Sequence, residues 1–127
     1  PSIKEKSAVS RLLFCSGKIY YDLQASRDSR KATDTAIIRL EQLYPFPSEI
    51  LKSLAASYPS AKDAVWVQEE PQNMGPWTFI APRLRALLPS SLPLRYAGRM
   101  PSASPATGNA TVHKRELADL LEAALGS

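Results

Sequence analysis

The chain has 127 residues, which suits a single domain that buries one core. Hydrophobic residues make up 44% of it and charged residues 22%, a composition that excludes a wholly disordered chain. The formal net charge is +4, but the basic residues are scattered and do not gather into one stripe. We therefore expect no nucleic acid among its partners.

Cysteine and histidine are too few for a stapled or zinc-bound domain. Cys15 is the single cysteine and His113 the single histidine, which excludes an internal disulfide and argues against a structural zinc site. No apolar stretch has the roughly 20 residues of a membrane span, so we expect no membrane partner. The sequence begins with Pro1 rather than methionine, so we expect a chain that was processed or cut from a longer one.

The first third of the sequence predicts a strand, a helix and a second strand. Residues 11–15 form a short apolar run that is closed by Ser16 and Gly17. A helical pattern begins near residue 20 and frays over residues 27–31. Residues 35–40 are rich in β-branched side chains and predict the second strand.

A second helix follows the rigid Tyr-Pro-Phe-Pro connection. Ser48 is its expected N-cap, and it stops before Pro59. Its expected core-facing residues are Ile50, Leu51, Leu54 and Ala55.

The remaining chain predicts two more strands and two more helices. Residues 63–68 are almost continuously apolar and predict a strand buried on both faces. We expect a helix over residues 79–88 and a strand over 94–97. A loop rich in Ser, Pro, Ala and Gly over residues 98–109 precedes a final helix over 112–125, whose apolar stripe comprises Leu117, Leu120, Leu121 and Ala124.

Strands that alternate with helices predict an α/β fold with three layers, in which a mostly parallel sheet has helices on both faces. We divide the chain into an N-terminal linker or extension, residues 1–10, and a single domain, residues 11–127.

The end of the third strand is the most conspicuous candidate site. Glu69 and Glu70 follow an apolar strand and precede a turn with Pro, Asn and Gly. Neighbouring side chains on a strand point to opposite sides, which argues against a carboxylate pair for acid–base chemistry. Either one glutamate is solvated while the other pairs near the next helix, or a carboxylate and Asn73 shape an interdomain or ligand cleft.

The other polar candidates do not complete a catalytic set. The segment from Cys15 to Lys18 could receive an anion but lacks the phosphate-loop pattern, and Cys15 is interpreted as a small buried hydrophobe. His113 is expected in a polar role at the start of the last helix. Arg95 and Arg99 share one face of their strand and could bind an anion or pair with acids of a neighbouring domain. Trp66 and Trp77 are expected to be a core aromatic and a loop anchor.

Several spaced motifs together closely resemble the C-terminal domain of the 2-oxoglutarate dehydrogenase E1 family, a transketolase-type domain. The resemblance covers residues 11–125 and occurs in the family's order. The segments that carry it are CSGKIYYDL (15–23), RLEQLYPFP (39–47), VWVQEEPQNMGPW (65–77), RYAGR (95–99) and SASPATG (102–108).

The resemblance implies part of an enzyme that decarboxylates 2-oxoglutarate and transfers succinyl to the lipoyl arm of E2. It implies thiamine diphosphate and Mg bound by other domains, so this chain would carry no catalytic, cofactor or metal residue and would be inactive alone. The implied partners are the other E1 domains, a second E1 subunit in a homodimer, and the E2 succinyltransferase. The implied location is the mitochondrial matrix, with bacterial cytoplasm as the alternative.

For the residues that match the family's motifs, the resemblance implies interdomain or interface packing. These candidates are Glu69, Glu70, Asn73, Gly75, Trp77, Arg95, Arg99, Ser104 and His113. Two alternatives stay open: the same domain of 2-oxoadipate dehydrogenase E1, which shares the Glu-Glu-Pro-Gln-Asn-Met-Gly-Pro-Trp pattern, and a free-standing interaction module without catalysis.

Overall fold

The structure is a computed structural model that describes residues 8–31, 34–41, 46–72, 74–99, 117 and 120–125. Residues 117 and 120–125 are helical, and we call residues 120–125 the C-terminal helical segment. The other elements are β1 (Arg11–Cys15), α1 (Ile19–Arg30), β2 (Thr35–Arg39), α2 (Ser48–Ala56), β3 (Asp63–Pro71), α3 (Trp77–Leu87) and β4 (Leu94–Arg99).

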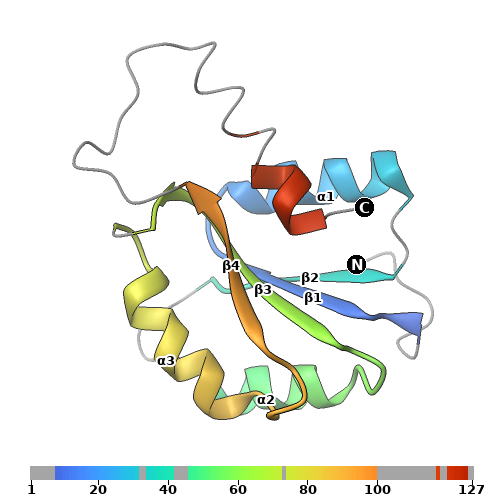
Figure 1. The fold of residues 1–127 in the computed structure, drawn as a ribbon, viewed down its shortest axis with the longest axis vertical. Helices are drawn as coiled ribbons and strands as arrows, with labels where there is room; N and C mark the ends of the chain where they lie inside the picture. Colours follow the sequence, from blue (N-terminus) through green and yellow to red (C-terminus); the bar gives the residue numbers. More distant parts are fainter. Residues whose placement is uncertain are drawn as a thin grey trace.

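The four described strands form one sheet in the order β2-β1-β3-β4, and every pair is parallel. In Figure 1, α1 and the C-terminal helical segment lie on one side of this sheet, and α2 and α3 lie on the other. The predicted three-layer α/β fold is therefore confirmed. The strand order reverses between β1 and β3, so the carboxyl ends of these two strands flank the switch point of the sheet.

Each face of the sheet has its own hydrophobic core. Phe14 and Trp66 belong to the cluster under α2 and α3, whereas Leu13 and Val65 belong to the cluster under α1 and the C-terminal helical segment. Successive residues of β1 thus enter opposite cores, which explains why its residues 12–15 are all apolar and buried. The stripe predicted for the last helix is confirmed, because Leu120 and Ala124 lie in the second cluster and the partly buried Leu117 and Leu121 pack against it.

The prediction that Ile50 points into the core is wrong. Ile50 is 65% exposed, whereas Leu51 and Ala55 are buried. Successive helical residues are turned by about 100°, so a helix that buries positions 51 and 55 directs position 50 away from the sheet. The predicted N-cap also shifts by one residue, since Ser48 is the first helical residue and Pro47 is the N-cap.

Several predicted boundaries also differ. β3 does not end at Gln68 but reaches Pro71, because the chain pairs again with β4 after a register shift. α3 begins two residues earlier than predicted, at Trp77. α1 does not fray over residues 27–31; it continues to Arg30 and is capped by Lys31, whose φ of 55° lets its N–H reach the last carbonyls. Val9, within the predicted linker, is fully buried, and the domain division itself stays a prediction.

Candidate functional site

The most elaborate polar structure at the carboxyl end of the sheet is the segment that leads from β3 into α3. We call residues 68–77 the β3–α3 rim. The regular pairing of β3 with β4 is interrupted between Gln68 and Pro71, which resumes pairing with Arg99. Such a bulge redirects side chains at the end of a strand and leaves backbone groups that need other partners.

The side chain of Gln68 supplies those partners. It is 2% exposed, and its Oε1 accepts hydrogen bonds from the indole Nε1 of Trp66 at 2.9 Å and from the backbone N–H of Trp77 at 3.0 Å. Its Nε2 donates to the carbonyl oxygens of Glu70 at 3.2 Å and Met74 at 2.8 Å. One buried amide therefore connects the strand, the turn and the first residue of the helix.

The two glutamates occupy different environments, as the strand pattern predicts. Glu69 is half-buried and Glu70 is exposed. The carbonyl oxygen of Glu70 also accepts a hydrogen bond from the hydroxyl of Tyr96 at 3.2 Å. The backbone at Glu70 is thus held from two sides, while its carboxylate remains available to solvent or to another chain.

Gly75 lets the turn pack against Glu70. Its φ is +67°, a conformation that favours glycine, and a Cβ placed there would lie 3.0 Å from the Cβ of Glu70. The sequence prediction that Glu70 and Gly75 belong to one local structure agrees with this close approach.

Trp77 anchors the rim within this chain. Its side chain is buried, 8% exposed, and its ring lies 5.2 Å from that of Tyr96. Arg85, further along α3, places its guanidinium carbon 5.4 Å from the centroid of the Trp77 indole. The burial of Trp77 agrees with the predicted role as a loop anchor, and its predicted role in interdomain packing stays a prediction.

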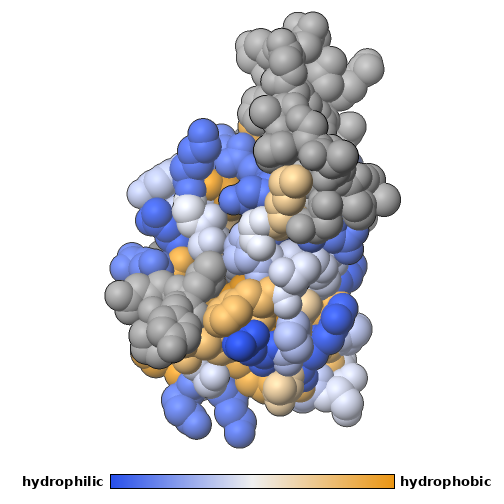
Figure 2. All heavy atoms as spheres, turned by 90° about the vertical axis from the view of Figure 1, so that its left-hand side faces the viewer, coloured by the Kyte–Doolittle hydropathy of each residue, from blue (hydrophilic) through white to orange (hydrophobic). Residues whose placement is uncertain are grey.

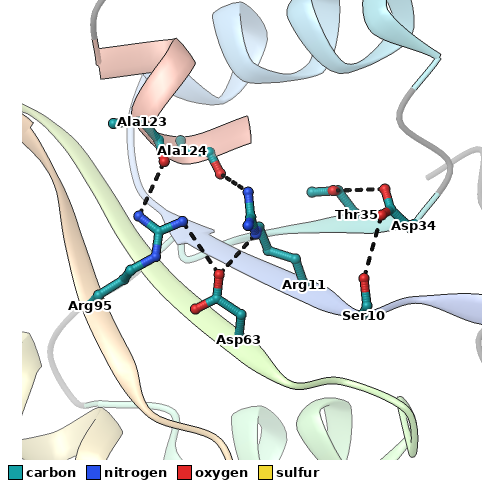
Figure 3. A network of polar contacts seen from close by, with 8 residues as sticks. All are labelled: Ser10, Arg11, Asp34, Thr35, Asp63, Arg95, Ala123 and Ala124. Carbon is teal, nitrogen blue, oxygen red and sulfur yellow. Dashed lines mark hydrogen bonds and ion pairs between the residues drawn. The ribbon is translucent and has the colours of Figure 1, made fainter. Parts of the chain in front are cut away.

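Arg95 lies away from this rim, at the other end of the sheet. Together with Arg11 and Asp63 it forms what we call the amino-end cluster (Figure 3). Asp63 Oδ2 pairs with Arg11 Nε at 2.9 Å and with Arg95 Nη2 at 3.3 Å. The acidic partner of Arg95 is therefore Asp63 of this chain, whereas the sequence predicted an anion or an acidic group of a neighbouring domain.

The amino-end cluster also binds the C-terminal helical segment. Arg11 donates to the carbonyl oxygen of Ala124 and Arg95 to that of Ala123, both at 3.1 Å. Figure 3 shows both guanidinium groups directed from the strands toward this segment. Cationic donors at the end of a helix satisfy carbonyls that have no partner within the helix and suit its dipole.

A polar hollow lies between the carboxyl ends of β1 and β2. It has a volume of about 360 Å³ and is lined by Ser16, Gly17, Arg39, Leu40 and Glu41. The guanidinium of Arg39 also lies over the rings of Tyr20 and Tyr21, 5.4 and 5.2 Å from their centroids. The lining that the structure describes contains both charge signs and no catalytic constellation.

Cys15 is the buried hydrophobe that the sequence predicts. Burial raises the pKa of its thiol to about 12, and nearby Arg39 offsets only part of that rise. The thiolate is the nucleophilic form, so this residue is inert at neutral pH.

The side of the molecule where α3 lies has a surface of mixed hydropathy. Figure 2 shows apolar atoms on this face interrupted by strongly hydrophilic side chains. On α3, the guanidinium carbon of exposed Arg83 lies 3.7 Å from the centroid of the ring of half-buried Phe79. The arginine covers apolar area and leaves it charged at the surface.

Some expected groups cannot be placed. Asn73, Ser104 and His113 lie outside the described residues, and Arg99 is described as part of β4 without its side chain. Among the described residues, no group of three His, Cys, Asp or Glu side chains is arranged to hold a metal ion. The helices of the described part of the chain include none that is long and apolar enough to cross a membrane.

The fold and these sites define a parallel α/β domain whose described polar structures hold segments together rather than form a catalytic centre. The family described as "2-oxoglutarate dehydrogenase C-terminal" matches residues 1–125. The chain therefore belongs to this family, as the motifs predicted.

Individual relatives agree with this assignment. The chain is similar to the 2-oxoglutarate dehydrogenase E1 component of Cupriavidus necator, with 48% identity over 93% of the chain, and to that of an Exiguobacterium species, with 47% over 92%. It is also 42% identical, over 94% of its length, to a probable 2-oxoadipate dehydrogenase complex component E1 homolog of Dictyostelium discoideum. The matched region spans 12% of the first two relatives and 13% of the third.

Sequence reasoning missed Gln68 and the Arg11–Asp63 pair. The signal for Gln68 was present, because it follows Ala64 and Trp66 on the same face of β3 and is therefore a polar residue at a core-facing position. The signal for the pair was opposite charge at the starts of two strands, which the parallel register places side by side.

Proposed function

We propose that this chain is the C-terminal domain of a 2-oxoglutarate dehydrogenase E1 subunit, an oxidoreductase component that decarboxylates 2-oxoglutarate and passes succinyl to lipoyl-E2. The observation that carries the proposal is the family match over residues 1–125, with near-complete coverage of this chain by a small part of much longer E1 relatives. Within that subunit the chain acts by packing, since its described residues offer no catalytic set.

The β3–α3 rim is the proposed packing surface. Glu70 is exposed and Glu69 is half-buried, and the backbone carbonyl of Glu70 is held by hydrogen bonds from Gln68 and Tyr96. A fixed backbone lowers the ordering cost of forming an interface. Asn73, Arg99, Ser104 and His113 remain predicted members of this surface or of the dimer contact.

Thiamine diphosphate and Mg are assigned to the rest of the proposed subunit. The donor set in the described part of this chain does not fit a magnesium site. Calorimetry of the chain with thiamine diphosphate and Mg should show no binding heat. Micromolar binding would contradict this assignment.

The proposed partners are the other E1 domains, a second E1 subunit and the E2 succinyltransferase. The proposed location is the mitochondrial matrix, with bacterial cytoplasm as the alternative, and the similar proteins come from bacteria and from Dictyostelium. The Dictyostelium relative supports keeping the same domain of 2-oxoadipate dehydrogenase E1 as a second candidate. A free-standing, non-catalytic interaction module is the third.

Capture of the natural gene product from its source cells, followed by intact mass and activity measurements, tests the proposal. A mass far above the chain's 13.9 kDa, with decarboxylation of 2-oxoglutarate, is the expected result. Preference for 2-oxoadipate in the same assay would favour the second candidate. A product of the chain's own mass and without decarboxylation would identify a free-standing module.

A further inference from the structure

The β3–α3 rim requires a side chain that accepts two hydrogen bonds and also donates two. Two N–H groups, from Trp66 and Trp77, point at one atom of residue 68, and two carbonyl oxygens, from Glu70 and Met74, face the other. Only a primary amide presents two acceptor sites and two donors in one planar group. Asparagine has the same amide but is one methylene shorter.

The bonds of Gln68 cross the bulge and do not merely reinforce the strand. Trp66 lies before the bulge, Glu70 within it, and Met74 and Trp77 beyond it. The amide therefore ties together backbone groups that neither the sheet ladder nor the helix holds in common. Because the side chain is 2% exposed, water cannot readily replace these bonds if the amide is removed.

Gly98 lets β4 approach the end of β3 closely. Gly98 is paired with Gln68 across the sheet, and a Cβ on Gly98 would lie 2.7 Å from the carbonyl oxygen of Gln68 and 2.5 Å from the hydroxyl of Tyr96. That hydroxyl in turn donates to the carbonyl oxygen of Glu70. The close approach of β4 thus supports the same backbone position that the Gln68 amide fixes.

We propose that Gln68 is the positioning residue of the β3–α3 rim, and that its amide sets the path of the chain from Glu70 to Trp77 and hence the direction in which the Glu70 carboxylate faces a partner. The inference rests on the proposed function for the partner, which is another part of the E1 subunit. The local positioning itself depends only on this chain.

Hydrogen exchange in the 127-residue chain tests the local part directly. In the wild-type chain, the side-chain amide protons of Gln68 should exchange at least about tenfold more slowly than those of Gln24, a partly exposed glutamine on α1. Equal exchange rates would overturn the proposal without any variant having to fold.

Gln68→Met then separates positioning from general stability, with Gln24→Met as the matched control. We expect exchange of backbone amides in residues 70–77 to rise at least about tenfold more than exchange in β1 and α1. The control should leave the rim unchanged. A uniform rise over the whole chain would show a structural role only and would overturn the proposal.

If Gln68→Met does not fold, Tyr96→Phe provides a milder test. It removes the hydroxyl bond to Glu70 but keeps the Gln68 amide, so exchange of the Trp77 amide should stay close to wild type. Loss of protection at Trp77 in this variant would overturn the assignment of positioning to Gln68.

The partner is tested separately, by placing Gln68→Met in the complete E1 subunit. We expect the variant to keep the fold of this chain but to show weaker dimer or domain association. The Gln24→Met control should associate normally. If wild-type chain makes no contact with the rest of the subunit through the rim, the proposed function of this surface fails while the exchange result on Gln68 stands on its own.

Discussion

At the carboxyl end of the sheet, the neutral amide of Gln68, 2% exposed, holds the β3–α3 rim. At the amino end, three charged side chains that are between 25% and 42% exposed hold the C-terminal helical segment (Figure 3). Both devices solve the same problem, which is to satisfy backbone groups where regular structure ends. The Gln68 amide does so in the buried interior, whereas the amino-end cluster does so at the partly exposed surface.

The difference determines how each end responds to change. A buried amide cannot readily exchange its partners for water, so removing it leaves the rim groups that it bonded without partners, at a free-energy cost. Partly exposed ion pairs compete with water and with salt, and their loss costs less. The rim is therefore expected to behave as a rigid surface and the amino-end cluster as a weaker, salt-sensitive contact.

Gln68→Glu should cause the largest effect. A carboxylate keeps both acceptors but loses both donors, and its charge would face the carbonyl oxygens of Glu70 and Met74. We expect the free energy of unfolding to fall by about 3 kcal/mol or more, with little dependence on salt. Urea unfolding followed by tryptophan fluorescence measures this. Gln24→Glu is the control, and a loss below about 1 kcal/mol at position 68 would break the comparison.

Gly98→Ala should cause the next largest loss in the free energy of unfolding. The added methyl group would meet the backbone oxygen of Gln68, which cannot move without shifting β3, so we expect a loss of about 2 kcal/mol. Gly17→Ala is the matched change, because position 17 has open space and only its φ of +77° opposes a side chain, which costs about 1 kcal/mol. The same urea assay compares them. A larger loss at position 17 would contradict close packing at the rim.

Asp63→Asn should cost about 1 kcal/mol at low salt, because it removes the charge shared by Arg11 and Arg95 while their bonds to the helical segment remain. Salt screens the wild-type pairs, so the difference between variant and wild type should shrink in about 0.5 M NaCl. A difference that grows with salt would show that the cluster acts through packing and not through charge.

Arg30→Ala should have the smallest effect. Arg30 pairs with Glu122 at 2.8 Å, but Glu122 is 61% exposed, so the expected loss is about 0.5 kcal/mol or less. Hydrogen exchange of residues 120–125 should barely change. If this single substitution released the segment, the Arg30–Glu122 pair and not the amino-end cluster would be its principal attachment.

The sequence predicts the layers and the two cores because strand and helix periods follow directly from which side chains must be buried. It also predicts that Glu70, Gly75 and Trp77 belong together. It does not predict the bulge after Gln68, because an interrupted ladder depends on how closely β4 approaches at Gly98. Nor does helix periodicity alone show that Ile50 falls outside the buried stripe, since the edge of that stripe is set by where α2 meets the sheet.

The most direct test of the account compares hydrogen exchange of this chain alone with that of the same residues in the complete E1 subunit. Slower exchange in residues 69–77 of the subunit, with residues 120–125 little changed, is the predicted result. Unchanged exchange at the β3–α3 rim, together with new protection elsewhere on the chain, would contradict the claim that the rim is the surface through which this domain packs.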